Sequence, residues 1–205
     1  TETSGIAVTI GHTTSETTVA DNLTVTGDFA ANNFKFGGAN FTSSLLVGHS
    51  TSGTLNAATY NTGVGFEALD ALTSGDYNTA VGWLACSAVT TGSKNTGIGL
   101  AALKLVEGGS LNTAIGNGAG DNITSGSGNV IIGDITADSA TGDRQLKITG
   151  YDGATATTWI DGDSSGNLVF PADVTLGDDL VLDSDSCVLK FGDDQDVTLT
   201  HTDGT

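Results

Sequence analysis

The sequence has no methionine, and Pro171 is its only proline among 205 residues. A collagen-like helix is therefore excluded, because it needs glycine and proline together at a strict three-residue period. The 30 glycines lack both that partner and that period. Since methionine is missing even at position 1, we expect either a processed chain or a segment of a longer protein.

Basic residues are also scarce. The chain has 6 lysines and arginines against 24 aspartates and glutamates, so its formal charge is −18 at pH 7. An acidic surface of this kind repels nucleic-acid phosphates and anionic membranes. No apolar run approaches the length of a membrane span. We therefore expect no nucleic-acid partner and no membrane insertion.

Catalytic chemistry has little support in the sequence. The histidines at positions 12, 49 and 201 lie in separate regions among Gly, Ser and Thr, with no nucleophile motif near them. Cys86 and Cys187 are far apart and have no metal-binding neighbours. Cys86 shares a repeated column with leucines, so we expect a buried thiol. We expect that the protein is not an enzyme.

Metal binding is the remaining candidate for site chemistry. Residues 161–166 begin like the calcium loop of an EF-hand, but Ala172 stands at the twelfth position, where that loop needs glutamate. No flanking helix is expected either. We therefore expect no cofactor. Calcium shared across a turn stays open as a minor alternative for four aspartates, Asp178, Asp179, Asp183 and Asp185.

A 17-residue repeat dominates the middle of the chain. Each copy has an asparagine at its first position and a glycine at its fifth. The asparagines are Asn61, Asn78, Asn95, Asn112 and Asn129, and the glycines are Gly65, Gly82, Gly99, Gly116 and Gly133. A worn copy at residues 44–48 keeps the same register, so residues 44–133 hold about six units, with atypical units at both ends.

The repeat predicts an all-β fold with a central β-solenoid over residues 44–133. A 17-residue unit is too short to bury its own apolar face, but stacked units share one continuous core. We read each unit as one coil of short strands with glycine corners, and place its Val/Ile and Leu columns inside. Stacked asparagines would then form an amide ladder. A strand with a short helix stays open as an alternative, because residues 66–72 and 100–106 look locally helical.

The flanks are expected to be β-structured as well. Residues 1–43 are read as an N-terminal β region, residues 134–160 as a connecting segment with a strand at 145–149, and residues 161–205 as C-terminal strand and turn repeats. Short strands are expected at five places in the two outer regions, namely 8–11, 22–27, 167–170, 180–182 and 197–200.

Bulky residues follow the repeated glycine in successive copies. Phe66, Trp83 and Leu100 share this column, and Asn117 ends it. Such side chains do not fit inside a 17-residue coil beside the other apolar columns. They would then form an outward apolar stripe that needs a partner. The alternative is that they cap the core of a monomer.

The repeat unit Asn-Thr-Ala/Gly-Val/Ile-Gly-x-x-Ala-Leu, closed by Thr-Ser/Thr-Gly, resembles the 17-residue repeats of bacteriophage tail-fibre proteins. It is more loosely similar to the head repeats of trimeric autotransporter adhesins. The flanking stretches at residues 21–28 and 188–201 resemble structural proteins of marine phages. This resemblance implies a homotrimer, with Phe66, Trp83 and Leu100 as its candidate interface.

The resemblance also implies a function. It points to a structural component of a virion tail fibre or a similar extracellular fibre, serving as a stiff spacer and in host attachment. The partners would be other fibre or virion proteins and a host surface glycan or protein. A bacterial cell-surface adhesin or surface filament is the alternative. The second alternative is a monomeric β-solenoid that binds a ligand or ice, although no Thr-x-Thr array repeats within the coils.

Overall fold

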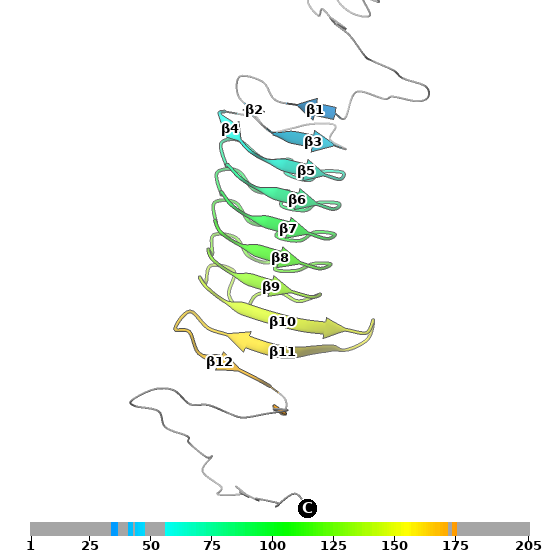
Figure 1. Cartoon of the computed structure of the whole chain (residues 1–205), viewed down its shortest axis with the longest axis vertical. Helices are drawn as coiled ribbons and strands as arrows, with labels where there is room; N and C mark the ends of the chain where they lie inside the picture. Colours follow the sequence, from blue (N-terminus) through cyan, green and yellow to red (C-terminus); the bar gives the residue numbers. More distant parts are fainter. Residues whose placement is uncertain (1–33, 37–40, 43, 48–55, 172–173, 176–205) are drawn as a thin grey trace, which may run out of the picture. The chain divides into compact units, whose positions relative to one another are not determined.

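The computed structural model describes residues 34–36, 41–42, 44–47, 56–171 and 174–175. Residues 1–171 belong to one compact unit and residues 172–205 to another. The described part of the first unit is a β-solenoid of stacked coils (Figure 1). Helices are absent from the described residues.

Ten strands form one sheet in the order β1-β3-β5-β6-β7-β8-β9-β10-β11-β12, and β2 pairs with β4 in a second sheet. The strands are β1 Phe34–Phe36, β2 Phe41–Thr42, β3 Leu45–Val47, β4 Ala58–Thr59, β5 Thr62–Val64, β6 Thr79–Val81, β7 Thr96–Ile98, β8 Thr113–Ile115, β9 Val130–Ile132, β10 Leu146–Tyr151, β11 Ala156–Gly162 and β12 Leu168–Val169.

Seven of these strands, β3 and β5 to β10, run parallel and make about six turns of the solenoid. Equivalent residues of successive coils face one another, so Thr62 lies opposite Thr79, and Thr79 opposite Thr96. The predicted solenoid is therefore confirmed. The parallel ladder continues to β10, inside the segment that we read as a connector.

Antiparallel strands flank the parallel ladder at both ends. At one end β1 pairs with β3, and at the other β11 pairs with β10 (Figure 1). A solenoid ends in an open strand edge that can pair with another chain unless something covers it. Because β1 and β11 run against the direction of the coils, each covers such an edge and stops parallel stacking there.

Each coil has one strand in its main ladder, and the rest of the coil is built from tight turns. Residues in left-handed backbone conformation recur at three positions of the repeat. They are Glu67, Leu84 and Ala101, then Leu69, Cys86 and Leu103, then Tyr77, Lys94 and Leu111. Left-handed residues interrupt a right-handed helix. The helical alternative for residues 66–72 and 100–106 is therefore wrong.

The core lies between the strands and these turns. Ala68 and Leu72 and their counterparts in later coils are completely buried, as expected. The Val/Ile column is not inside. Within each central strand the buried residue is glycine or alanine, and Val64, Val81, Ile98 and Ile115 point outward with exposed fractions of 37–41%. Our placement of that column was wrong, because strand alternation puts it on the side opposite the asparagine.

The buried strand position alternates between glycine and alanine. It is Gly63 and Gly97 in two coils, and Ala80 and Ala114 in the coils that follow them. A Cβ atom at Gly97 would lie 2.6 Å from the Cys86 sulfur. The interior therefore has no room for a methyl group at this glycine. Small residues on the strand leave space for the larger side chains that the turns place in the core.

The two repeated glycine columns differ in backbone conformation, although a Cβ atom in either column would meet a carbonyl oxygen of the next coil. Gly82 and its counterparts at the fifth position have φ between +111° and +138°, so the predicted glycine corner is present there. Gly92 and its counterparts do not need that conformation. A Cβ atom at Gly92 would lie 2.3 Å from the carbonyl oxygen of Gly109 in the next coil. Close stacking, rather than turn geometry, requires this second glycine.

Candidate functional site

The repeated asparagines form a buried ladder through the solenoid. Asn61, Asn78, Asn95, Asn112 and Asn129 are all fully buried. From Asn78 onward, each side-chain nitrogen donates to the Oδ1 of the preceding asparagine over 3.0–3.1 Å. Each of the five also donates to a glycine carbonyl over 2.9–3.0 Å. The predicted amide ladder is confirmed.

The ladder ends on different polar side chains. The backbone N–H of Asn61 donates to the Ser44 hydroxyl over 2.7 Å. At the other end, the backbone and side-chain nitrogens of Gln145 donate to Oδ1 of Asn129. The last coil therefore closes in 16 residues instead of 17, with a longer amide in place of asparagine. Both ends keep the buried amides satisfied, as buried polar groups require.

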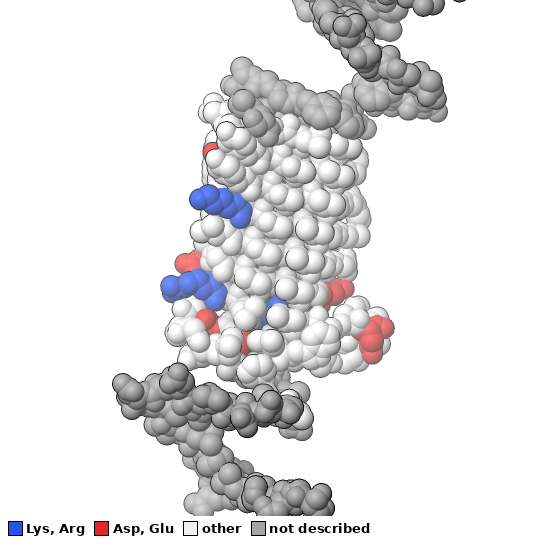
Figure 2. Space-filling view, in the orientation of Figure 1, with Lys and Arg blue, Asp and Glu red and all other residues white. Residues whose placement is uncertain are grey.

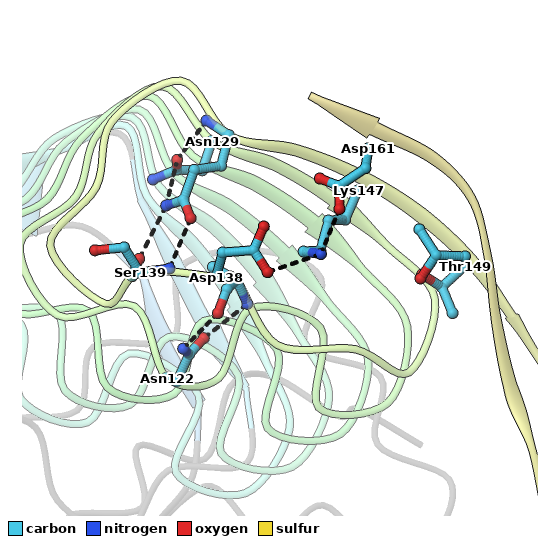
Figure 3. A network of polar contacts seen from close by, with 10 residues as sticks. Asn122, Asn129, Asp138, Ser139, Lys147, Thr149 and Asp161 are labelled. Atoms are coloured by element: carbon cyan, nitrogen blue, oxygen red, sulfur yellow. Dashed lines mark hydrogen bonds and ion pairs between the residues drawn. The ribbon is translucent and has the colours of Figure 1, made fainter. Parts of the chain in front are cut away.

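A buried lysine closes the core at the same end. Lys147 occupies the inward position that holds Ile131 in the coil before it. Its ammonium contacts the carboxylates of Asp138 at 2.8 Å and Asp161 at 2.9 Å, as Figure 3 shows. Burial opposes the charge, but hydrogen bonds and attraction from both carboxylates outweigh it and raise the pKa of Lys147.

The candidate metal and thiol residues have structural partners. In residues 161–166, Asp161 pairs with Lys147, and Asp163 accepts hydrogen bonds from Ser165 and Asn167 in a local turn. Within the described residues, no group of three His, Cys, Asp or Glu side chains is arranged to hold a metal ion. Cys86 is buried, and burial raises its pKa to about 12, so its thiol stays protonated at neutral pH.

Several other candidates lie outside the described residues. They are His12, His49, His201, Cys187, Asp178, Asp179, Asp183 and Asp185. The expected strands at 8–11, 22–27, 180–182 and 197–200 lie there as well.

The predicted stripe residues lie on the outer side of the solenoid. Phe66, Trp83 and Leu100 have exposed fractions of 53%, 52% and 46%. The Val/Ile column, two residues earlier in each coil, is exposed as well. We call these two columns together, with the outward threonines of the same strands, the strand face. Reasoning from the sequence missed its Val/Ile half, although the period-two alternation that begins at each asparagine would have indicated it.

The strand face carries no charge in the four central coils. The charged residues of residues 61–128 all fall at later positions of the repeat and are Glu67, Asp70, Asp76, Lys94, Lys104, Glu107 and Asp121. Figure 2 shows a wide uncharged area across the coils, with charged side chains mainly toward one side and the lower end. In a chain of charge −18, an uncharged area repels another acidic molecule less than a charged area does.

No protein family, curated protein or solved structure matches this chain. Among the described residues, no helix is both long enough and apolar enough to cross a membrane.

Proposed function

We propose that this chain is a stiff segment of an extracellular fibre, such as a virion tail fibre, in which three copies associate along the strand face. The observation that carries the proposal is the uncharged apolar strand face on a strongly acidic chain. Contiguous exposed apolar surface of this kind marks an interaction site in soluble proteins. The Val/Ile column repeats in four successive coils and the bulky column in three of them, which fits a partner that follows the solenoid over those coils.

The hydrogen bonds between successive coils support the proposed stiffness of the solenoid. Each central coil is joined to the next by a parallel strand pair and by the amide ladder. Turn residues add further bonds between coils, such as that from the Cys86 nitrogen to the Ala102 carbonyl at 2.9 Å. Because these bonds run along the stacking direction, stretching or bending the solenoid must break several at once. A spacer needs this property, and it is independent of any chemical reaction.

A bacterial surface adhesin would use the same architecture, and an attachment role fits both settings. A monomeric ice-binding or ligand-binding solenoid is the second candidate, and one observation favours it. Thr62, Thr79, Thr96 and Thr113 form a half-buried outward column beside the Val/Ile column. The bulky side chains of Phe66 and Trp83 are exposed in the same coils. They favour a partner with complementary shape over a flat crystal surface.

Native mass in solution tests the proposal. Light scattering of the wild type is expected to give about three times 20.5 kDa, with no change on dilution. The double substitution Val81→Ser/Trp83→Ser should lower the mass toward that of one chain. Tyr77→Ser is the matched control, because Tyr77 is 53% exposed but lies in another column.

The outcomes separate the two candidate functions. A monomeric wild type would overturn the trimeric fibre and favour the solitary solenoid. A trimer that survives the double substitution would keep the fibre but place its interface away from the strand face.

A further inference from the structure

The β10–β11 hairpin differs from every coil before it. Its strands have 6 and 7 residues, whereas the strands of the central coils have 3. In Figure 1 its turn extends past the ends of the shorter strands. The hairpin carries two exposed aromatic residues, Tyr151 at 51% and Trp159 at 56%.

A β-bulge sets the position of Trp159. Ile148 pairs with Ile160 and Thr149 with Thr158, so Trp159 is an extra residue without a partner across the ladder. Bulges of this kind redirect a side chain and recur beside functional sites. The indole lies against Gly150, where a Cβ atom would be only 2.5 Å from its Cζ2 atom. Glycine therefore makes room for the ring, which is held in place while more than half of the residue stays exposed.

A hollow of about 350 Å³ lies beside this indole. It is lined by Gly150, Tyr151, Asp152, Thr155, Thr157 and Trp159. Oδ1 of Asp152 accepts hydrogen bonds from the backbone nitrogens of Ala154 at 2.9 Å and Thr155 at 2.7 Å. These bonds lower the pKa of Asp152 and hold its carboxylate at the rim.

We propose that this hollow binds a neutral saccharide ring, with Trp159 as the stacking platform and Asp152 as the hydroxyl acceptor. A pyranose has an apolar face of C–H groups that fits an aromatic ring, and hydroxyls that donate to a fixed carboxylate. Small-ligand sites combine apolar walls with a few placed polar groups in this way. The Asp152 charge and the chain's net charge of −18 disfavour uronic and sialic acids.

A second copy of the chain fits this hollow less well. Asp152 is exposed, and burying its carboxylate in a self-association interface would require an opposite charge that the hollow does not offer. A polar pair also separates the hairpin from the apolar stripe, since Asn117 donates to Asp134 over 2.8 Å in the stripe's own column. The inference rests on the attachment role proposed above, but it does not depend on the trimer.

Saturation-transfer NMR with methyl glycosides tests the site on the full chain. The probes are the methyl glycosides of glucose, galactose, mannose and N-acetylglucosamine, with methyl glucuronide as the acidic comparison. A ligand of this size at an open hollow should bind with a dissociation constant on the order of 1 mM. At least one neutral probe should show saturable transfer. Trp159→Ala should weaken it at least about tenfold, and Asp152→Asn should weaken it less, because the amide oxygen can still hold the turn.

Tyr60→Ala is the control, since Tyr60 is 53% exposed and stacks on Tyr77 in an earlier coil. It should leave transfer unchanged. Absence of saturable transfer for all four neutral probes would overturn the proposal, as would equal transfer in the wild type and Trp159→Ala. Light scattering on the same samples separates this result from the fibre proposal, because monovalent probes can bind a monomer or a trimer. A lower native mass in Trp159→Ala without sugar binding would place the hairpin in the chain interface.

Discussion

The inner and outer sides of strands β5 to β8 differ in both polarity and size. Asparagine and glycine or alanine face inward, while threonine and valine or isoleucine face outward. A narrow coil has little interior volume beside its leucines, so its strand contributes small residues and an amide that stacks on its own copies. Apolar residues that do not fit inside stay exposed. The inside of this solenoid thus provides stability, and in the proposed fibre its outside would provide recognition.

Removing one inner amide should have the largest effect. Asn95→Leu would leave the backbone and side-chain N–H groups of Asn112 and the carbonyl of Gly109 without their partner. We expect a loss on the order of 3 kcal/mol in the free energy of unfolding, because buried groups would be unsatisfied. Urea denaturation followed by circular dichroism measures it.

The outer asparagine Asn117 is the matched control for that experiment. It is exposed, and the same column holds leucine at position 100. Asn117→Leu should therefore change stability by no more than about 0.5 kcal/mol. Equal losses for the two substitutions would show that burial of the ladder does not matter.

Two adjacent glycines also allow a closely packed position to be compared with an open one, with a smaller expected change in stability. A Cβ atom at Gly109 would lie 2.3 Å from the Gly126 carbonyl oxygen, whereas one at Gly108 would meet only the Thr91 hydroxyl at 3.6 Å. Gly109→Ala should destabilise by about 2 kcal/mol, since a neighbouring backbone must move. Gly108→Ala should be neutral or stabilise by about 0.5 kcal/mol. The melting temperatures of both variants test this difference. A larger decrease in melting temperature for Gly108→Ala than for Gly109→Ala would contradict the inference that close stacking requires Gly109.

The repeat made the solenoid and its ladder predictable, because a column of identical residues can only stack on itself. Asn61 to Asn129 follow this rule, as do the corner glycines from Gly65 to Gly133. The side on which valine and isoleucine lie was not predictable from hydrophobicity alone. Their position follows from strand alternation, counted from the buried asparagine three residues earlier, which hydrophobicity does not reveal.

Structural features that occur only once in the chain could not be predicted from the repeat. Lys147 lies 16 residues after Ile131, whose inward position it takes in the next coil. The 17-residue spacing of the repeat therefore does not predict that Lys147 is buried. Trp159 reaches Gly150 through a bulge, and neither residue belongs to a repeated column. The candidate saccharide site was therefore beyond sequence reasoning, whereas Phe66, Trp83 and Leu100 were visible as a column and remain a predicted interface.

Lys147, at the charged end of the solenoid interior, should contribute less to the free energy of unfolding than the buried asparagine Asn95 in its middle. Lys147→Met keeps the aliphatic stem but removes the ammonium between Asp138 and Asp161, and we expect a loss of about 1 kcal/mol at pH 7. The pKa of Lys147 is raised above 10.5, so this contribution is complete below that pH and is lost as the pH rises through the folded-state value. The stability gap between wild type and variant should therefore narrow above about pH 10.5. A gap that stays constant would assign the effect to packing.

The smallest expected effect lies on the outer side, at a left-handed residue. Lys94 has φ +60° and an exposed side chain, so its backbone strain is not offset by burial. Asparagine tolerates this conformation better than lysine, and Lys94→Asn should stabilise the fold by about 0.5 kcal/mol. Lys104→Asn is the control, because Lys104 is not among the residues with positive φ. Differential scanning calorimetry should show a small rise in melting temperature for the first variant and no rise for the second. Equal shifts would mean that charge, rather than backbone conformation, is responsible.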